Sequence, residues 1–98
     1  MKINALIMDI NDNVATCTRE ILSGETVLFC KDGELVKIIA KEMVPYCHKV
    51  AIAPIKKGEC VFKYGEIIGV ATEDIPIGGW VYHENIESLP RDYDSEFI

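Results

Sequence analysis

The chain has 98 residues, of which 49% are hydrophobic, and its formal net charge is −6, which indicates one globular domain rather than two domains or a disordered chain. An acidic surface repels phosphate groups, and no basic stripe with interleaved aromatic residues is present, so we expect neither nucleic acid nor a membrane as a partner. No apolar run approaches the ~20 residues that are needed to cross a bilayer. Because Asp9 and Asp12 come too early for a signal peptide, we expect a cytoplasmic protein.

The first predicted strand covers residues 3–8, and its period-two alternation places Ile3, Ala5 and Ile7 on one face. The next segment, residues 14–22, fits either one or two helical turns or a strand rich in β-branched residues. We favour a strand because a repeated sequence pattern runs through this segment.

The hairpin predicted next consists of strands over residues 26–30 and 35–40, joined by a turn built on Asp32-Gly33. Several short segments of the same kind follow, bounded by Gly or Pro, and Trp80 in the last of them is expected in the core. The sequence therefore predicts an all-β domain. The later strands are expected over residues 50–53, 60–64, 67–71 and 80–83, with turns at 64–66 and 76–79.

One turn pattern occurs four times: an apolar residue, two variable residues, Gly, two more variable residues and Val. The apolar residue ends a buried strand, Gly adopts a positive φ at little steric cost, and Val begins the next strand. In one copy Cys47 replaces Gly, so it either holds that φ with some strain or marks another turn type. The copies are Ile21, Gly24, Val27; Val44, Cys47, Val50; Ile55, Gly58, Val61; and Ile75, Gly78, Val81.

The domain is expected to cover residues 1–87, and residues 88–98 form an acidic tail without periodicity. The tail is either an arm that docks on a partner through Tyr93, Phe97 and Ile98 or a disordered segment. The sequence leaves both alternatives open.

The chain contains four cysteines, and no two of them have the Cys-x-x-Cys spacing of a structural zinc site. Since nothing points to export, we expect reduced, buried thiols that pack as small hydrophobic side chains. The four are Cys17, Cys30, Cys47 and Cys60.

The residues with possible chemistry lie mainly between residues 48 and 85. His48 precedes a strand and is either a ligand or proton carrier or an ordinary surface histidine. The turn at Lys63, Tyr64 and Glu66 combines an ammonium, a phenol and a carboxylate. Such a turn can hold a substrate carboxylate, although solvated turn charges are the more common explanation.

The segments HKVA, KKGE-x-V-x-KYGE-x-IG-x-A and DI-x-x-G-x-x-V, in this order and spacing, resemble the small SAF-type domain of the altronate and galactarate dehydratase family. The (2R)-sulfolactate sulfo-lyase small subunit belongs to the same group. The resemblance begins at DNVA (residues 12–15) and ends at Asn85. It implies a β-clip fold, with short strands joined by glycine-containing turns and little or no helix.

The activity implied by the resemblance is that of a lyase that removes water or a sulfonate group from a sugar acid or related hydroxy acid. In this family the small domain is fused to, or paired with, a much larger catalytic part, so the chain resembles a separate small subunit that is inactive alone. The implied mechanism is abstraction of the proton α to a carboxylate, with a divalent iron or manganese ion held mainly by the large subunit.

Two other readings stay open at this stage. One is a non-catalytic SAF-type module that binds a sugar acid or a peptide, and the other is a domain that only oligomerises, so the isolated chain is a candidate homo-oligomer. The KYGE-x-IG segment separates the lyase from these alternatives, whereas the glycine turns suit all of them.

The resemblance also implies functional residues in this chain. We expect a small anionic substrate and a large catalytic subunit as partners of this site. The implied residues are His48, Lys63, Tyr64 and Glu66 for catalysis, Lys49 and Asn85 for substrate binding, and His83 and Glu84 for metal binding.

Two departures from the family pattern concern this site. The family ends this segment with two histidines flanking one residue, followed by Asn; counted back from Asn85, those positions are Tyr82 and Glu84, with His83 between them. Because neighbours on a strand point to opposite faces, His83 does not simply replace either histidine. The second departure is Cys47, where relatives have Gly.

Overall fold

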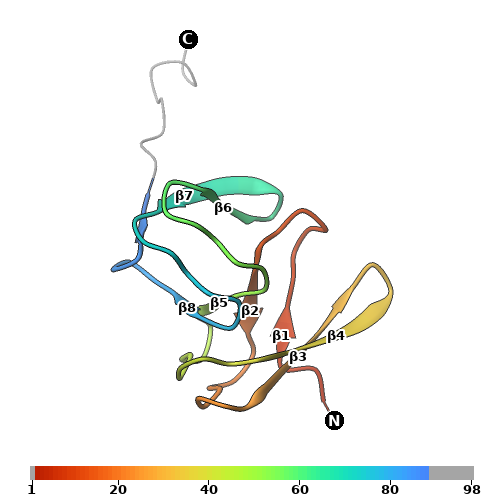
Figure 1. Ribbon diagram of the computed structural model, residues 1–98. Helices are drawn as coiled ribbons and strands as arrows, with labels where there is room; N and C mark the ends of the chain where they lie inside the picture. Colours follow the sequence, from red (N-terminus) through yellow and green to blue (C-terminus); the bar gives the residue numbers. More distant parts are fainter. Residues whose placement is uncertain (1, 89–98) are drawn as a thin grey trace.

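The computed structural model describes residues 2–88, in which the chain forms nine short strands and no helix (Figure 1). The predicted all-β class is therefore confirmed. The acidic tail expected over residues 88–98, apart from Ser88, lies outside the described residues. The strands are β1 (Ala5–Leu6), β2 (Val14–Cys17), β3 (Thr26–Lys31), β4 (Glu34–Ile39), β5 (Lys49–Ala51), β6 (Cys60–Lys63), β7 (Glu66–Ala71), β8 (Trp80–Val81) and β9 (Ile86–Glu87).

In the part of the chain from residue 2 to residue 88, no helix is present that is long and apolar enough to cross a membrane.

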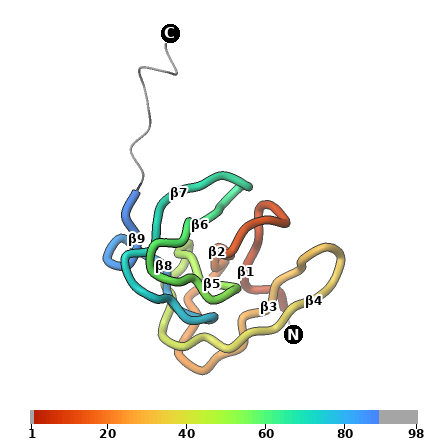
Figure 2. The backbone as a smooth tube through the Cα atoms, turned by 45° about the horizontal axis from the view of Figure 1, so that its top comes forward, coloured from red at the N-terminus to blue at the C-terminus, as the bar shows by residue number. Residues whose placement is uncertain are grey.

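A central antiparallel sheet has the strand order β1-β2-β5-β8. The hairpin β3–β4 packs on one side of it and the sheet β6-β7-β9 on the other, as Figures 1 and 2 both show. Each side has its own apolar core, which we call the hairpin core and the opposite core. The hairpin core contains Ala5, Ala15, Cys17, Ile21, Val27, Phe29, Ala40, Val44 and Val50. The opposite core contains Val14, Ala51, Ile55, Val61, Ala71, Ile75 and Val81.

Two Val-Ala pairs of the sequence explain how the central sheet packs against an apolar core on each of its faces. Successive residues of a strand point to opposite faces, so Val14 belongs to the opposite core and Ala15 to the hairpin core. On β5 the order is reversed, with Val50 facing the hairpin core and Ala51 the opposite core. Because Val14 pairs with Ala51 and Ala15 with Val50, each face carries one large and one small side chain per pair.

The three glycine copies of the repeated turn have the predicted backbone conformation. The φ angles are +86° at Gly24, +89° at Gly58 and +87° at Gly78, as position i+2 of a type II turn requires. Cys47 has φ +66°, so of its two alternatives the strained one is correct. In each turn the N–H of the fourth residue donates to the carbonyl of the first: Glu25 to Leu22, His48 to Pro45, Glu59 to Lys56 and Gly79 to Pro76.

An unpaired N–H at the first residue of each turn is avoided in one of two ways. In two copies a glutamate at the fourth position accepts it, since Leu22 N–H donates to Glu25 Oε1 (2.9 Å) and Lys56 N–H to Glu59 Oε1 (2.7 Å). In the other two copies the first residue is proline, which has no N–H to satisfy. These prolines are Pro45 and Pro76.

Several predicted element boundaries were wrong. The first strand is only β1, and Ile3 is 43% exposed instead of facing the core. Residues 14–22 contain strand only up to Cys17, and the last predicted strand ends at Val81. Strand β9 was missed, because its two residues have no periodicity of their own and are recruited by pairing with β7.

The cysteine prediction was only partly right. All four thiols are free, but only Cys17 is buried. Cys30 is exposed because it lies opposite Leu35 on the outer face of the β3–β4 hairpin. Cys47 is exposed at the tip of its turn, and Cys60 is half-buried.

Candidate functional site

The start of β5 divides the predicted site residues between the two sides of the central sheet. His48 continues the pairing of β5 with β2, since its carbonyl accepts the N–H of Cys17 at 2.9 Å. His48 and Lys49 therefore point to opposite faces. His48 contacts Trp80 on the side of the hairpin core, whereas Lys49 shares its face with Ala51 of the opposite core.

On the first side, three aromatic side chains form what we call the aromatic shelf: His48, Trp80 and Tyr82. The Trp80 and Tyr82 rings are stacked, with centroids 3.8 Å apart and planes inclined by 8°. The Trp80 indole N–H donates to His48 Nδ1 at 3.1 Å. Trp80 was expected in the core, but it is only half-buried: one part packs on the hairpin core and the other holds the exposed His48.

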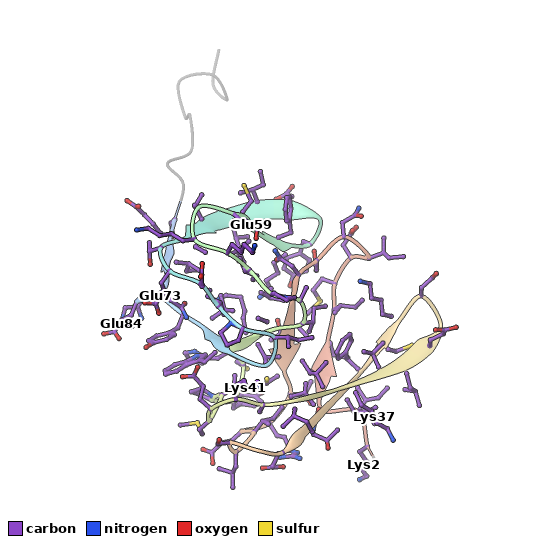
Figure 3. All side chains as sticks on the ribbon, in the orientation of Figure 1. Lys2, Lys37, Lys41, Glu59, Glu73 and Glu84 are labelled. Carbon is purple, nitrogen blue, oxygen red and sulfur yellow. The ribbon has the colours of Figure 1, made fainter. Side chains whose placement is uncertain are left out.

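Carboxylates surround the aromatic shelf. The Tyr82 hydroxyl donates to Glu84 Oε2 at 3.1 Å, and the Trp80 backbone N–H donates to Glu42 Oε2 at 3.3 Å. The hydrogen bond to Glu84 and then burial raise the pKa of Tyr82, and the charges of Glu84, Glu42 and Glu73 raise it further. Glu73 and Glu84 lie at the same edge of the molecule (Figure 3). This side therefore offers a neutral phenol within a negative rim.

Asn85 holds the aromatic shelf in place. Its buried side chain accepts the Tyr82 N–H at Oδ1 (2.9 Å) and donates from Nδ2 to the Trp80 carbonyl (2.6 Å). Both ends of the amide are thus bonded to the backbone of shelf residues. The substrate-binding role of Asn85 stays a prediction, and the geometry adds a positioning role.

The two predicted metal ligands lie beside the aromatic shelf. His83 is exposed and stands edge-on against Tyr82, with centroids 5.6 Å apart. Glu84 is exposed and accepts the Tyr82 hydroxyl. Among residues 2–88 no three His, Cys, Asp or Glu side chains are grouped so that they could hold a metal ion. A metal at His83 and Glu84 therefore requires further ligands from elsewhere.

On the other side of the sheet lies what we call the lysine pair, Lys49 and Lys63. Lys49 is half-buried, and its pKa is lowered by burial and then by the positive charge of Lys63. The Lys63 ammonium lies 5.5 Å from the centre of the Tyr64 ring. Within residues 2–88 the only ion pair joins Arg19 and Glu25, so neither lysine is neutralised by a described carboxylate. Two uncompensated ammonium groups at one place favour an anionic ligand.

The turn after Lys63 is fixed by a buried carboxylate that the sequence analysis did not single out. Asp12 accepts four backbone N–H groups, from Met8 (3.1 Å), Asp9 (3.0 Å), Tyr64 (3.1 Å) and Gly65 (2.8 Å). These bonds fit the left-handed conformation of Tyr64, which has φ +59°. The available signal was the DNVA segment, in which this acid lies two residues before the start of a strand.

Asn13 extends the same support along β6. Its Nδ2 donates to the Cys60 carbonyl (2.9 Å) and its Oδ1 accepts the Phe62 N–H (2.8 Å). The strand pairing of β6 with β7 shifts register at this point, between Val61 and Phe62. The first two residues of DNVA thus position the KYGE turn.

Tyr64 and Glu66 both lie on the surface. Tyr64 is 63% exposed at the tip of the turn, and Glu66 is exposed at the start of β7. Glu66 is the register partner of Lys63. The structure therefore relates Lys63 to Lys49, Tyr64 and Glu66, and it places Lys49 and His48 on opposite faces at the start of β5.

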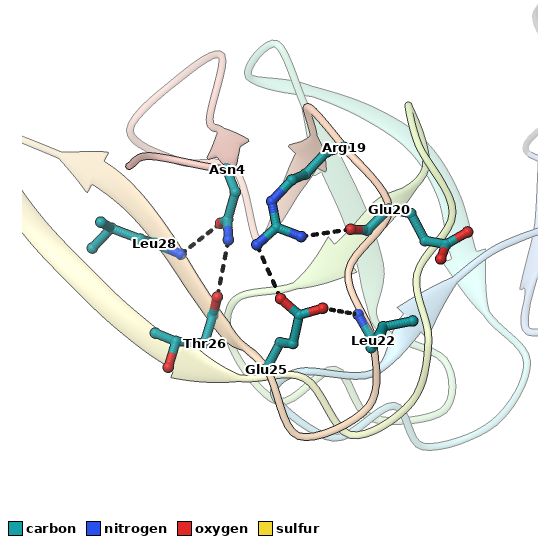
Figure 4. A network of polar contacts seen from close by, with 7 residues as sticks. All are labelled: Asn4, Arg19, Glu20, Leu22, Glu25, Thr26 and Leu28. Atoms are coloured by element: carbon teal, nitrogen blue, oxygen red, sulfur yellow. Dashed lines mark hydrogen bonds and ion pairs between the residues drawn. The ribbon is translucent and has the colours of Figure 1, made fainter. Parts of the chain in front are cut away.

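A hollow of about 360 Å³ lies away from both groups and contains no predicted site residue. Three of its polar side chains, those of Asn4, Arg19 and Glu25, make hydrogen bonds that hold the fold (Figure 4). Asn4 bonds to the backbone of Thr26 and Leu28, and Arg19 bonds to Glu25 at 2.9 Å, which, with the Leu22 N–H, lowers the pKa of Glu25. Since Arg19 is already paired with Glu25 and no predicted site residue lines the hollow, we do not place the site here. The hollow is lined by Lys2, Ile3, Asn4, Thr18, Arg19, Glu25 and Thr26.

Comparison with known proteins places these residues in context. The family model of the altronate/galactarate dehydratase SAF domain matches residues 3–89. The chain is 34% identical over 77 residues to altronate dehydratase of Bacillus subtilis (strain 168). The matched region covers 79% of this chain and 15% of that protein. It is 35% identical over 94 residues to altronate dehydratase of Escherichia coli (strain K12), covering 96% of this chain and 17% of that protein.

In a shorter relative, the matched region covers most of the relative's own length. The chain is 37% identical over 57 residues to (2R)-sulfolactate sulfo-lyase subunit alpha of Paracoccus pantotrophus, which is 58% of this chain and 85% of that subunit. The chain thus spans a small part of the altronate dehydratases and most of the sulfo-lyase subunit.

Proposed function

Because the chain belongs to the altronate/galactarate dehydratase SAF domain family, we propose that it is the small subunit of a lyase that acts on a hydroxylated acid. In this proposal it completes an active site together with a separate large subunit in the cytoplasm. The similarity to a protein named as a subunit, most of whose length is covered, supports the separate-subunit form.

The observation that carries the proposal is the lysine pair. A sugar acid or sulfolactate brings at least one carboxylate, and two unpaired ammonium groups beside a half-buried surface can bind it. Lys49 is positioned by β5 and Lys63 by the turn that Asp12 holds. In this role the lysines orient the acid while the large subunit acts on its α carbon.

Tyr64 and Glu66 complete this group. The Tyr64 ring lies against the Lys63 ammonium, and its hydroxyl is free to contact a hydroxyl group of the acid. Glu66 is exposed beside them and is assigned a proton-transfer role. His48 flanks the other side of the same strand start, so a large subunit that covers the start of β5 contacts both groups.

The described residues do not make a complete metal site, because no three suitable ligands are grouped among them. Divalent iron or manganese is therefore assigned to the large subunit, and no step assigned to this chain passes through it. In this proposal His83 and Glu84, which are both exposed, add ligands to that metal ion.

The proposal is tested with altronate, galactarate and sulfolactate, using the chain alone and in complex with a large subunit purified from the native source. We expect turnover only in the complex. Lys63→Met should reduce it by about 10²-fold, as the loss of one charged substrate contact does, whereas Lys56→Met, which changes an exposed turn lysine, should leave it unchanged. Full activity of the isolated chain, or equal rates for both variants, contradicts the proposal.

A non-catalytic binding module is the second candidate, and the aromatic shelf favours it. Stacked Trp80 and Tyr82 rings that are half-exposed suit the stacking of a sugar ring or a peptide side chain. This function predicts binding of a peptide by the isolated chain that Trp80→Ala abolishes and Lys63→Met does not. Lys63→Met therefore separates the two functions, because it reduces lyase turnover but leaves this binding unchanged.

A further inference from the structure

His48 is held by a hydrogen bond that determines which of its nitrogens carries a proton. The indole nitrogen of Trp80 is a donor only, and it lies 3.1 Å from His48 Nδ1. Nδ1 must therefore offer a lone pair. A neutral imidazole has one N–H, so the proton of neutral His48 lies on Nε2. The other tautomer would direct two N–H groups at each other.

Trp80 is restrained on several sides. Its backbone pairs with Val50, its carbonyl accepts the Asn85 side chain, and its N–H donates to Glu42. Its ring is stacked on Tyr82. The indole N–H is therefore not free to turn toward another acceptor.

The backbone of His48 is restrained as well. Its N–H donates to the Pro45 carbonyl at 3.0 Å, which closes the second repeated turn, and its carbonyl accepts the Cys17 N–H at 2.9 Å. The imidazole itself is exposed. One ring nitrogen is thus occupied by Trp80 and the other is available to a ligand or a partner.

We propose that Trp80 is a positioning residue that holds neutral His48 as its Nε2–H tautomer, so that His48 presents a hydrogen-bond donor to an acceptor oxygen. The acceptor class is a carboxylate, a hydroxyl or a developing oxyanion of the acid, and this assignment of the ligand rests on the proposed function. The tautomer itself does not.

The consequence for the reaction is a division of roles. A neutral imidazole with its lone pair engaged by an indole cannot take up the proton α to the carboxylate. That proton goes to another base, and His48 stabilises charge on oxygen through its Nε2–H. This differs from the proton-carrier role considered from the sequence.

The test is long-range ¹H–¹⁵N NMR on the ¹⁵N-labelled full chain at about pH 9, where histidines of ordinary pKa are neutral. The chain has two histidines, so His83, which stands edge-on to Tyr82 with no hydrogen bond among the described residues, is the internal control. We expect an Nε2–H signature for His48, averaged tautomers for His83, and a coupling across the hydrogen bond between Trp80 Nε1 and His48 Nδ1.

Trp80→Phe keeps a stacking ring but removes the N–H. It should shift the His48 signals toward those of His83 while the His83 signals stay in place. As much Nδ1–H in His48 as in His83, or no change in the variant, overturns the proposal. If the variant does not fold, the coupling across the hydrogen bond in the native chain decides: its presence supports the proposal and its absence overturns it. Neither result depends on lyase activity.

Discussion

The aromatic shelf and the lysine pair begin at adjacent residues and have opposite chemistry. His48 belongs to a surface with an indole, a phenol and a negative rim, whereas Lys49 belongs to a surface with two unpaired ammonium groups. The separation follows from the alternation of side chains along β5. A single dipeptide therefore supplies two different surfaces.

The two surfaces are also supported differently. Trp80 and Tyr82 of the aromatic shelf are held mainly by their own segment, through Asn85 and the turn that precedes Trp80. The lysine pair depends on Asp12, which is distant in sequence from the turn it holds. Variants can therefore disrupt one surface and leave the other.

The largest effect is expected for Gly78→Ala, at the turn that leads to Trp80. An added Cβ would collide with the carbonyl oxygen of Ile39, at a residue whose φ is +87°. We expect a loss of about 4 kcal/mol or more in the free energy of unfolding, measured by urea denaturation.

Gly58→Ala is the matched control, since it has φ +89° in an equivalent turn but nothing within 4 Å of the added Cβ. It should cost only about 1 kcal/mol, the cost of the backbone conformation itself. Equal losses for the two variants would show that the close contact at Gly78 does not contribute to the loss in the free energy of unfolding.

The next effect concerns the lysine pair. Asp12→Ala leaves four backbone N–H groups without their acceptor, so we expect a loss of about 3 kcal/mol and loosening of the turn at Tyr64. Amide hydrogen exchange should increase at Tyr64 and Gly65 but not at Trp80.

Asp74→Ala serves as the control, because this exposed carboxylate accepts one N–H, that of Lys57 at 2.8 Å. Its expected cost is below about 1 kcal/mol. If the Asp12→Ala chain were as stable as the Asp74→Ala chain, Asp12 would not be the residue that holds the turn at Tyr64.

His48 substitutions sharpen the comparison on the side of the aromatic shelf. In the complex, His48→Ala should reduce turnover by about 10²-fold, whereas His48→Gln, which retains an N–H donor, should lose about 10-fold or less. Steady-state rates of the two variants provide the measurement. Equal losses would indicate that His48 acts as a base.

A smaller effect is expected at alkaline pH on the side of the hairpin core. Burial raises the pKa of Cys17 from 9.0 to about 11, and the charge of Arg19 opposes this. The folded state thus holds the thiol proton more tightly than the unfolded state. The contribution of protonated Cys17 to the free energy of unfolding is therefore complete below pH 9.0 and is lost as the pH rises through about 11. At most about 2–3 kcal/mol is involved.

Urea denaturation at about pH 8, 10 and 11 would measure this loss. These pH values lie below and above the reference pKa of a thiol, about 8.5. Cys17→Ala should flatten the alkaline decline relative to the native chain. Cys30→Ala, which alters an exposed thiol, should leave the decline unchanged, and the opposite ranking would remove Cys17 as its cause.

The smallest effect has a reversed sign. Lys49 carries its charge in a half-buried place beside Lys63, which lowers its pKa, so its charged form is disfavoured by folding. Lys49→Met should therefore raise stability at pH 7, by less than about 1 kcal/mol because the group is partly solvated. Turnover by the complex should fall at the same time. A destabilised variant would mean that Lys49 has an unrecognised partner.

Part of the candidate site was visible from single residues. His48, Lys63, Tyr64 and Glu66 were identified individually, because ionisable groups at turns and strand starts are the usual carriers of binding chemistry, whereas Lys49 was implied only by the family resemblance. Their grouping into two sides was not predicted, since it depends on where strand pairing at β5 begins.

Asp12 and the surroundings of Trp80 were not predicted either. A carboxylate before a strand has many possible roles, and only the fold brings the KYGE turn onto it. A lone Trp in a strand is most often a core residue, and its exposure here results from the small area that β8 covers, which is two residues long.

The sequence by itself determined the all-β class and the positive φ at the glycines of three repeated turns, Gly24, Gly58 and Gly78. These properties depend on steric limits and side-chain alternation within a few residues. Only the tertiary structure decided that Asp12 holds residues 52 and 53 positions away and that Trp80 bonds to His48 across 32 positions. Such contacts depend on the packing of whole layers, which no local pattern encodes.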